Sequence, residues 1–140
     1  MITITRRIMI GGALAMAVAS CSRQGNEQGD IAAIEAVMRA SWDRPEAPLD
    51  AGPIAVSGDY AVADWTQGDM GGRALLRRDD SWKVVLCGGD SLRTAEGLQG
   101  VGVPREDAQS LEAGLARLEG NVAAGRLESM SRFAGIVRME

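Results

Sequence analysis

Four stretches of strand-forming residues follow one another through the middle of the chain with only short breaks between them. They occupy residues 53–57, 60–67, 73–78 and 82–87 and read PIAVS, YAVADWTQ, RALLRR and WKVVLC. The breaks are rich in glycine and aspartate, which are typical of tight turns. Because short turns between consecutive strands favour antiparallel pairing, this part of the chain predicts a single up-and-down sheet.

A helical pattern precedes the predicted sheet. Apolar residues recur there at helical spacing on one face, at Ile31, Ile34, Met38 and Trp42. Asp30 is the predicted N-cap, and Pro45 follows soon after the predicted end. We therefore expect this helix to pack its apolar face on the sheet.

Further helical patterns follow the sheet, over residues 90–100, 104–120 and 123–133. Residues 134–139 have the β-branched character of a closing strand. The predicted fold class is α+β: an N-terminal helix packed on a four- to five-stranded antiparallel meander, followed by C-terminal helices. Residues 30–140 are expected to form this single domain.

The N-terminus has the pattern of an export signal. Arg6 and Arg7 precede about twelve apolar or small residues, too few to span a bilayer, which needs roughly 20. Val-Ala-Ser-Cys at residues 18–21 resembles the lipobox of bacterial lipoproteins, which implies a signal peptide over residues 1–20 and lipidation of Cys21. Ser22 matches lipoproteins sorted to the outer membrane, facing the periplasm. The alternative is an ordinary secretory peptide and a soluble periplasmic protein, and either the Sec or the twin-arginine route fits.

Composition narrows the function classes. Polar residues 21–29 predict a flexible tether between anchor and domain. All 19 acidic residues follow Cys21 while two of the 15 basic ones precede it, so the mature chain carries a net charge of −6. This balance disfavours nucleic-acid binding. Histidine is absent, which removes the commonest general base and metal ligand, and we predict that the protein is not an enzyme.

Cys87 is the one thiol left in the chain if Cys21 carries lipid. It is either a buried small hydrophobe or a soft-metal ligand. A two-residue turn at Asp79-Asp80 would place Cys87 opposite Gly72, with Met70 in the adjoining loop. A thiolate and a thioether are donors that suit Cu(I), so Cys87 and Met70 are the candidate metal ligands.

Glycines and carboxylates surround this predicted pair. They form a candidate ligand or partner loop consisting of Gly68, Asp69, Gly71, Gly72, Gly88, Gly89 and Asp90. Glycines let a backbone approach a bound ion or peptide closely. The alternative is that they supply the positive φ angles of turns and that the carboxylates cap backbone amides.

Three segments carry a resemblance to a known family: WTQGDMGGRALLRR, LCGGD and SRFAGIVRM. They resemble copper uptake system-associated proteins, small periplasmic proteins of Gram-negative bacteria, over roughly residues 30–140. The resemblance implies a non-enzymatic accessory beside an outer-membrane copper receptor. With Cys87 and Met70 as its two soft donors, the protein would be a weak Cu(I) relay, held to the membrane by its lipid anchor. The rival function is a metal-independent binding or inhibitor lipoprotein that uses the 68–72 end as a peptide-contact edge.

Overall fold

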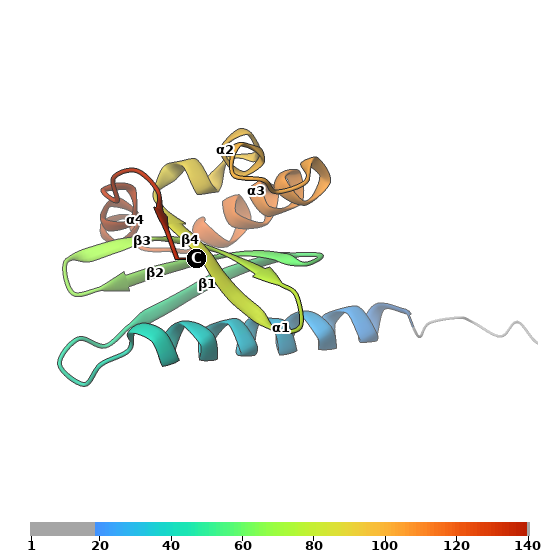
Figure 1. The fold of residues 1–140 in the computed structure, drawn as a ribbon, viewed down its shortest axis with the longest axis horizontal. Coiled ribbons are helices and arrows are strands. Elements are labelled where there is room, and N and C mark those ends of the chain that lie inside the picture. Colours follow the sequence, from blue (N-terminus) through green and yellow to red (C-terminus); the bar gives the residue numbers. More distant parts are fainter. Residues whose placement is uncertain (1–18, 140) are drawn as a thin grey trace, which may run out of the picture.

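The computed structural model describes residues 19–139 and has three layers: one helix, one sheet and a group of C-terminal helices (Figure 1). Helix α1 (Ala19–Trp42) comes first. The sheet consists of β1 (Asp50–Ser57), β2 (Tyr60–Gln67), β3 (Met70–Arg78), β4 (Trp82–Gly88) and β5 (Val137–Arg138). Between β4 and β5 lie the 3₁₀ helix η1 (Asp90–Arg93), α2 (Ala95–Gly100), α3 (Arg105–Glu119) and α4 (Ala124–Ser131). The predicted α+β class is confirmed.

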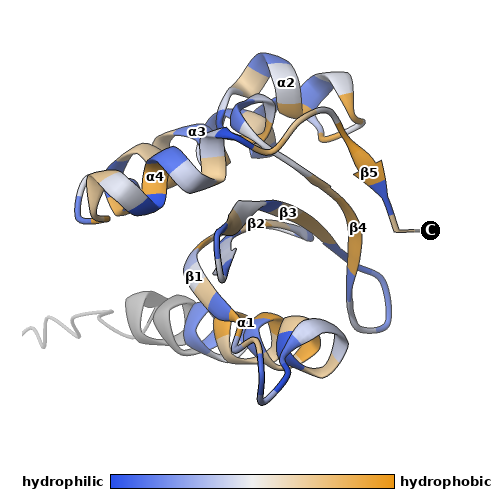
Figure 2. Ribbon diagram, turned by 90° about the vertical axis from the view of Figure 1, so that its left-hand side faces the viewer, coloured by the Kyte–Doolittle hydropathy of each residue, from blue (hydrophilic) through white to orange (hydrophobic). Residues whose placement is uncertain are grey.

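The strands form one antiparallel sheet in the order β1-β2-β3-β4-β5. Helices cover both of its faces, with α1 on one side and α2, α3 and α4 on the other (Figure 2). Two buried clusters result, one between the sheet and α1 and one between the sheet and the C-terminal helices. The central strands β2 and β3 are buried on both faces, and their continuous buried runs are apolar except for Asp64 and Arg73.

Helix α1 begins well before its predicted start at Asp30. It runs through residues 21–29, for which the composition predicted a flexible tether, and Asp30 lies inside it rather than at its N-cap. The Asp30 carboxylate instead accepts hydrogen bonds from Arg78 Nη1 at 2.7 Å and from Trp82 Nε1 at 3.2 Å. Asp30 therefore joins α1 to the end of β3 and the start of β4.

The predicted register of β3 against β4 is wrong. Arg78 pairs with Trp82, so three residues rather than two connect the strands, and an irregularity at Leu75/Leu76 adds a further residue to β4. Cys87 consequently pairs with Ala74 instead of Gly72. The error is two residues, and because side chains alternate with a period of two, Cys87 lies on the same face of the sheet as it would opposite Gly72.

The turn between β2 and β3 is shorter than predicted. Gln67 pairs with Met70, so Met70 is the first residue of β3 and Gly68-Asp69 form a two-residue hairpin turn. Gly68 has a φ of 60°, which glycine adopts without strain.

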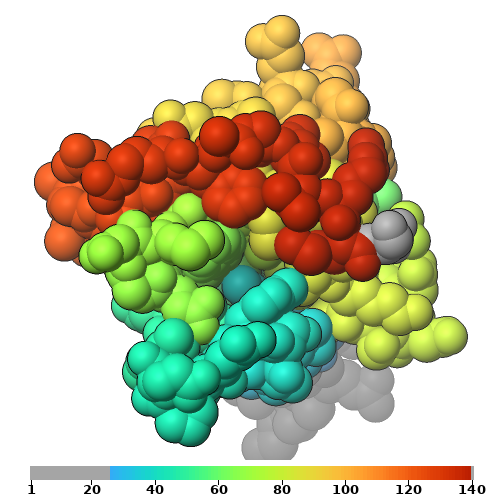
Figure 3. All heavy atoms as spheres, turned by 60° about the vertical axis from the view of Figure 1, so that its left-hand side comes forward, coloured from blue at the N-terminus to red at the C-terminus, as the bar shows by residue number. Residues whose placement is uncertain are grey.

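The C-terminal segment, residues 132–139, returns from α4 to the edge of the sheet. Within it the predicted closing strand is short: Val137 pairs with Cys87 and Arg138 with Leu86. The space-filling view shows this segment lying across one face of the molecule, next to the β2–β3 turn (Figure 3).

Candidate functional site

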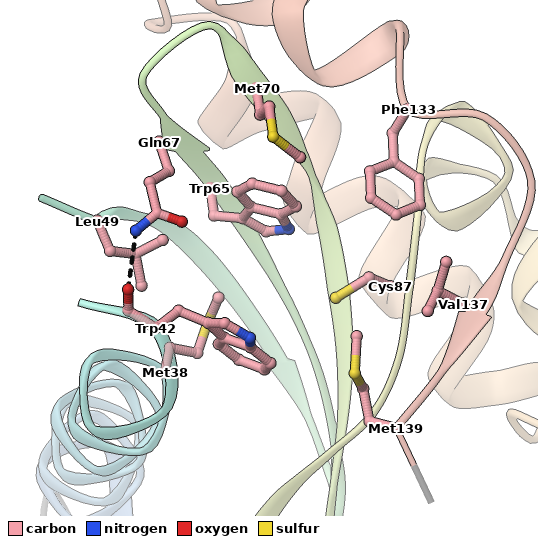
Figure 4. Close-up of a pocket in the computed structure, with 10 residues that line it drawn as sticks. All are labelled: Met38, Trp42, Leu49, Trp65, Gln67, Met70, Cys87, Phe133, Val137 and Met139. Carbon is pink, nitrogen blue, oxygen red and sulfur yellow. Dashed lines mark hydrogen bonds between the residues drawn. The ribbon is translucent and has the colours of Figure 1, made fainter. Parts of the chain in front are cut away.

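An apolar pocket of about 270 Å³ opens between the C-terminal end of α1, the sheet and the C-terminal segment (Figure 4). It is lined by Met38, Trp42, Leu49, Trp65, Gln67, Met70, Cys87, Phe133, Val137 and Met139. None of these side chains carries a charge at neutral pH, and this volume lies near the lower end for small-molecule sites. We call this site the apolar pocket.

Sulfur atoms are concentrated in the apolar pocket. Residues 26–139 contain four methionines, and only Met130 lies outside the lining. Met38 comes from α1, Met70 from β3 and Met139 from the C-terminal segment, and together with Cys87 on β4 they bring sulfur from four parts of the chain. Thioethers are polarizable and adapt to irregular apolar surfaces, and they are also soft metal donors.

The predicted pair Met70 and Cys87 shares this pocket but is not brought together as a pair of ligands. Figure 4 shows Met70 at one end of the pocket, beyond the rings of Trp65 and Phe133, and Cys87 on the other side of these rings beside Met139. The two rings form an edge-to-face contact with centroids 6.0 Å apart. Met70 is 64% exposed at the rim.

Cys87 fits the buried-thiol interpretation of the sequence. Its side chain belongs to the cluster between the sheet and α1, and burial raises the pKa of its thiol to about 11. The group is therefore protonated at neutral pH, and a metal ion would have to displace its proton.

The glycines of the predicted ligand loop do allow a close approach to the backbone, but the group that approaches is the chain's own C-terminal part rather than a ligand. A Cβ atom at Gly71 would lie 2.9 Å from the backbone nitrogen of Met130, and one at Gly72 would lie 2.9 Å from the Phe133 ring. At Gly89 it would lie 2.6 Å from the Phe133 carbonyl oxygen. The missing side chains at these positions thus let α4 and Phe133 pack directly against the sheet, where Phe133 forms part of the pocket wall.

The other members of the predicted loop have separate environments. A Cβ at Gly88 would lie 3.1 Å from the side chain of Leu92. Asp69 borders a shallow hollow beside α4, together with Arg132. The Asp90 carboxylate accepts hydrogen bonds from Arg73 Nη1 at 3.0 Å and Ser131 Oγ at 2.8 Å, so it holds α4 rather than facing the apolar pocket.

A buried charge cluster of Asp64, Arg73 and Glu119 lies under α3 and α4, on the other face of the sheet, and was not predicted. Arg73 Nε lies 2.9 Å from Glu119 Oε1 and 3.5 Å from Asp64 Oδ1, and the Arg73 side chain is fully buried. The Gly68-Asp69 hairpin places Asp64 directly opposite Arg73. Opposite charges at paired positions inside apolar strands were the sequence signal for this contact.

Trp65 is a further important residue that the sequence analysis did not predict. Its indole ring forms a wall of the apolar pocket, and its position depends on Phe133, which reaches it from far along the chain. Only knowledge of the path of the C-terminal segment would have revealed this contact.

Within residues 19–139, no helix is both long and apolar enough to cross a membrane. Residues 1–18 of the expected signal peptide and the side chain of Cys21 lie outside the described part of the chain.

Comparison with protein families, with curated proteins and with solved structures finds no match to this chain. The site is therefore interpreted from its own geometry.

Proposed function

We propose that this chain is a non-enzymatic, periplasm-facing lipoprotein that works by binding an apolar ligand in the apolar pocket, without a metal ion. The observation that carries the proposal is the pocket lining of aromatic rings and thioethers without a charged group. Four large apolar side chains are exposed in the described part of the chain, and Met70, Val137 and Met139 of these line the pocket. Exposed apolar side chains gathered at one opening are typical of a binding site.

Replacing Met139 with aspartate should weaken binding of the neutral fluorescent probe N-phenyl-1-naphthylamine by roughly tenfold or more, because it places a charge where apolar ligand must lie. Met139 is 41% exposed, so the fold should tolerate the change. Ile136→Asp is the matched control, since Ile136 is 42% exposed but is not part of the lining. Equal fluorescence titrations for the two variants would contradict the proposal.

The anchor is part of the proposal and rests on the Val-Ala-Ser-Cys pattern at residues 18–21. Acyl chains contribute about 0.8 kcal/mol per buried methylene, so two or three of them would hold the domain at the outer membrane. Cys21→Ser should abolish palmitate incorporation in a bacterial host with a lipoprotein-processing pathway. Undiminished labelling of the variant would contradict lipidation at this residue.

Cu(I) binding by a copper-uptake accessory is the second candidate, and the cluster of sulfur atoms favours it. Cys87, Met139 and Met38 line the same pocket. Two or three soft donors are a reasonable Cu(I) set, and the outer-membrane copper receptor implied by the family resemblance would be the partner. Among the side chains of residues 26–139, no three of His, Cys, Asp or Glu form a metal-binding group, so such a site would depend on thioethers.

Cu(I) binding is tested with a chromophoric chelator that competes for the ion. Cys87→Ser and Met139→Leu should each weaken binding if the second candidate is right, whereas Met130→Leu should not, because Met130 lies outside the pocket. Identical competition curves for wild type and Cys87→Ser would remove this candidate and leave the apolar ligand.

A further inference from the structure

The indole N–H of Trp65 is a buried donor without an acceptor. The Trp65 side chain is 9% exposed, and among the described residues its Nε1 atom has no hydrogen-bond partner. An unsatisfied buried donor costs about 1 to 3 kcal/mol, and few such groups occur in native proteins. In contrast, the corresponding atom of Trp82 donates to Asp30 at 3.2 Å.

The indole is held so that its nitrogen faces the apolar pocket. Figure 4 shows the Trp65 nitrogen on the side of the ring that is turned toward Cys87 and Phe133. Phe133 packs edge-to-face on the ring, and Gly72 leaves room beneath it, since a Cβ there would lie 3.0 Å from Trp65 Cζ2. The ring therefore has little freedom to turn its N–H toward solvent.

The lining of the apolar pocket does not satisfy this donor. Gln67 is the one lining residue with a side-chain amide, and its Nε2 donates to the carbonyl oxygens of Trp42 at 2.8 Å and Ala47 at 2.6 Å. The amide is thus oriented by the α1–β1 connection. Trp65 thus holds the buried, unpaired donor of the lining, whereas the indole of Trp42 is less buried. The Trp65 nitrogen has almost no surface open to solvent, so a ligand oxygen would reach it as neighbouring lining side chains shift.

We propose that the ligand is a small neutral molecule with an apolar body and a carbonyl-type oxygen, and that Trp65 Nε1–H donates a hydrogen bond to this oxygen. The inference rests on the proposed function and names its ligand class. A carboxylate would enter a pocket without a cationic side chain in its lining, which is costly. A bare metal cation would leave the N–H unpaired. The rings of Trp42, Trp65 and Phe133 suit a flat apolar body.

Two matched probes test the role of the donor: 2-acetylnaphthalene, which carries a carbonyl oxygen, and 2-ethylnaphthalene, which does not. The wild-type domain should bind the ketone about 2- to 10-fold more tightly, the range expected for one net hydrogen bond. In ¹⁵N-resolved NMR spectra, the ketone should move the Trp65 indole N–H proton signal downfield more than the hydrocarbon does. The Trp82 indole signal should not move with either probe.

Trp65→Phe keeps an aromatic wall but removes the donor, and it should lower ketone affinity to that of the hydrocarbon. Trp42→Phe is the control, because it removes another indole N–H from the same lining and should preserve the preference for the ketone. Thermal unfolding of both variants checks that they fold. If Trp65→Phe fails to fold, the wild-type preference and the Trp65 signal still decide the matter.

The outcomes separate this inference from the proposed function. Equal binding of ketone and hydrocarbon by the wild type overturns the role of Trp65 and leaves an apolar binding pocket. A preference for the ketone that survives in Trp65→Phe also overturns it. Failure of both probes to bind overturns the pocket as an apolar ligand site, and the inference with it.

Discussion

Arg73→Met is expected to lower the free energy of unfolding by about 3 to 5 kcal/mol at neutral pH, as measured by urea denaturation. Arg73 is fully buried and lies 2.9 Å from Glu119 and 3.0 Å from Asp90. Methionine fills much of the same space but leaves the buried Glu119 carboxylate without its nearest cation, so that the partly exposed Arg93 at 3.8 Å is the cation left beside it. The loss comes mainly from that poorly compensated charge, because desolvation of an ion without a close partner is costly.

Arg93→Met is the matched control for this prediction. Arg93 approaches the same Glu119 carboxylate at 3.8 Å, but its side chain is 44% exposed. Exposed ion pairs contribute about 0 to 1 kcal/mol, so this variant should stay within about 1 kcal/mol of wild type. Adding Glu119→Gln to Arg73→Met should recover part of the loss. A change of less than about 1 kcal/mol in Arg73→Met would mean that the cluster does not depend on this cation.

The strand order was predictable from the sequence because it depends on local signals. Four runs of strand formers with short turns between them left little choice but a meander. The register was not predictable, since the irregularity opposite Leu75/Leu76 falls at Val85, where no glycine marks it. The start of α1 was missed because Asp30, a good N-cap residue, is used instead in a tertiary contact with Arg78.

The candidate site was predictable only in part. Cys87 and Met70 were predicted at the same end of the sheet because that result depends on the up-and-down strand order, which survives a two-residue error in register. The contributions of Phe133 and Met139 depend on where the C-terminal segment returns to the sheet, more than 40 residues after β4 in the sequence. Local patterns carry no information on such a path, so the aromatic and sulfur lining became visible only in the fold.

The buried charge cluster should also make stability depend on pH through Asp64. The side chain is fully buried, and burial together with the neighbouring Glu119 raises the pKa of Asp64 to about 8 from 3.8. Between these two pH values the folded chain holds a proton that the unfolded chain has released. The contribution of Asp64 is therefore most favourable below about pH 4 and is lost as the pH rises toward 8.

Glu119 changes the stability in the opposite direction, because its contribution is lost at low pH. Burial is the largest single influence and opposes ionisation, but the hydrogen bonds with Arg73 and Asp64 and the charges of Arg73 and Arg93 together outweigh it and lower the pKa of the Glu119 carboxyl. The stability that Glu119 contributes is present above its unfolded-state pKa of 4.5 and is lost as the pH falls below that value. The two carboxyls together should give maximal stability in mildly acidic solution.

Asp64→Asn should remove the decline of stability between pH 4 and pH 8, because asparagine has nearly the same shape but takes up no proton on folding. Each unit of difference between the folded and unfolded pKa corresponds to about 1.4 kcal/mol. After allowance for burial of the amide, the free energy of unfolding of the variant should therefore exceed that of wild type by roughly 2 to 4 kcal/mol at pH 8. Near pH 4 the two proteins should differ little in their free energy of unfolding.

Urea denaturation from pH 4 to pH 8 measures the difference, with Asp59→Asn as the control, since Asp59 is 66% exposed beside Arg78. Parallel stability curves for wild type and Asp64→Asn would show that Asp64 is already ionised in the folded protein and that Arg73 is shared among three carboxylates, those of Asp64, Asp90 and Glu119.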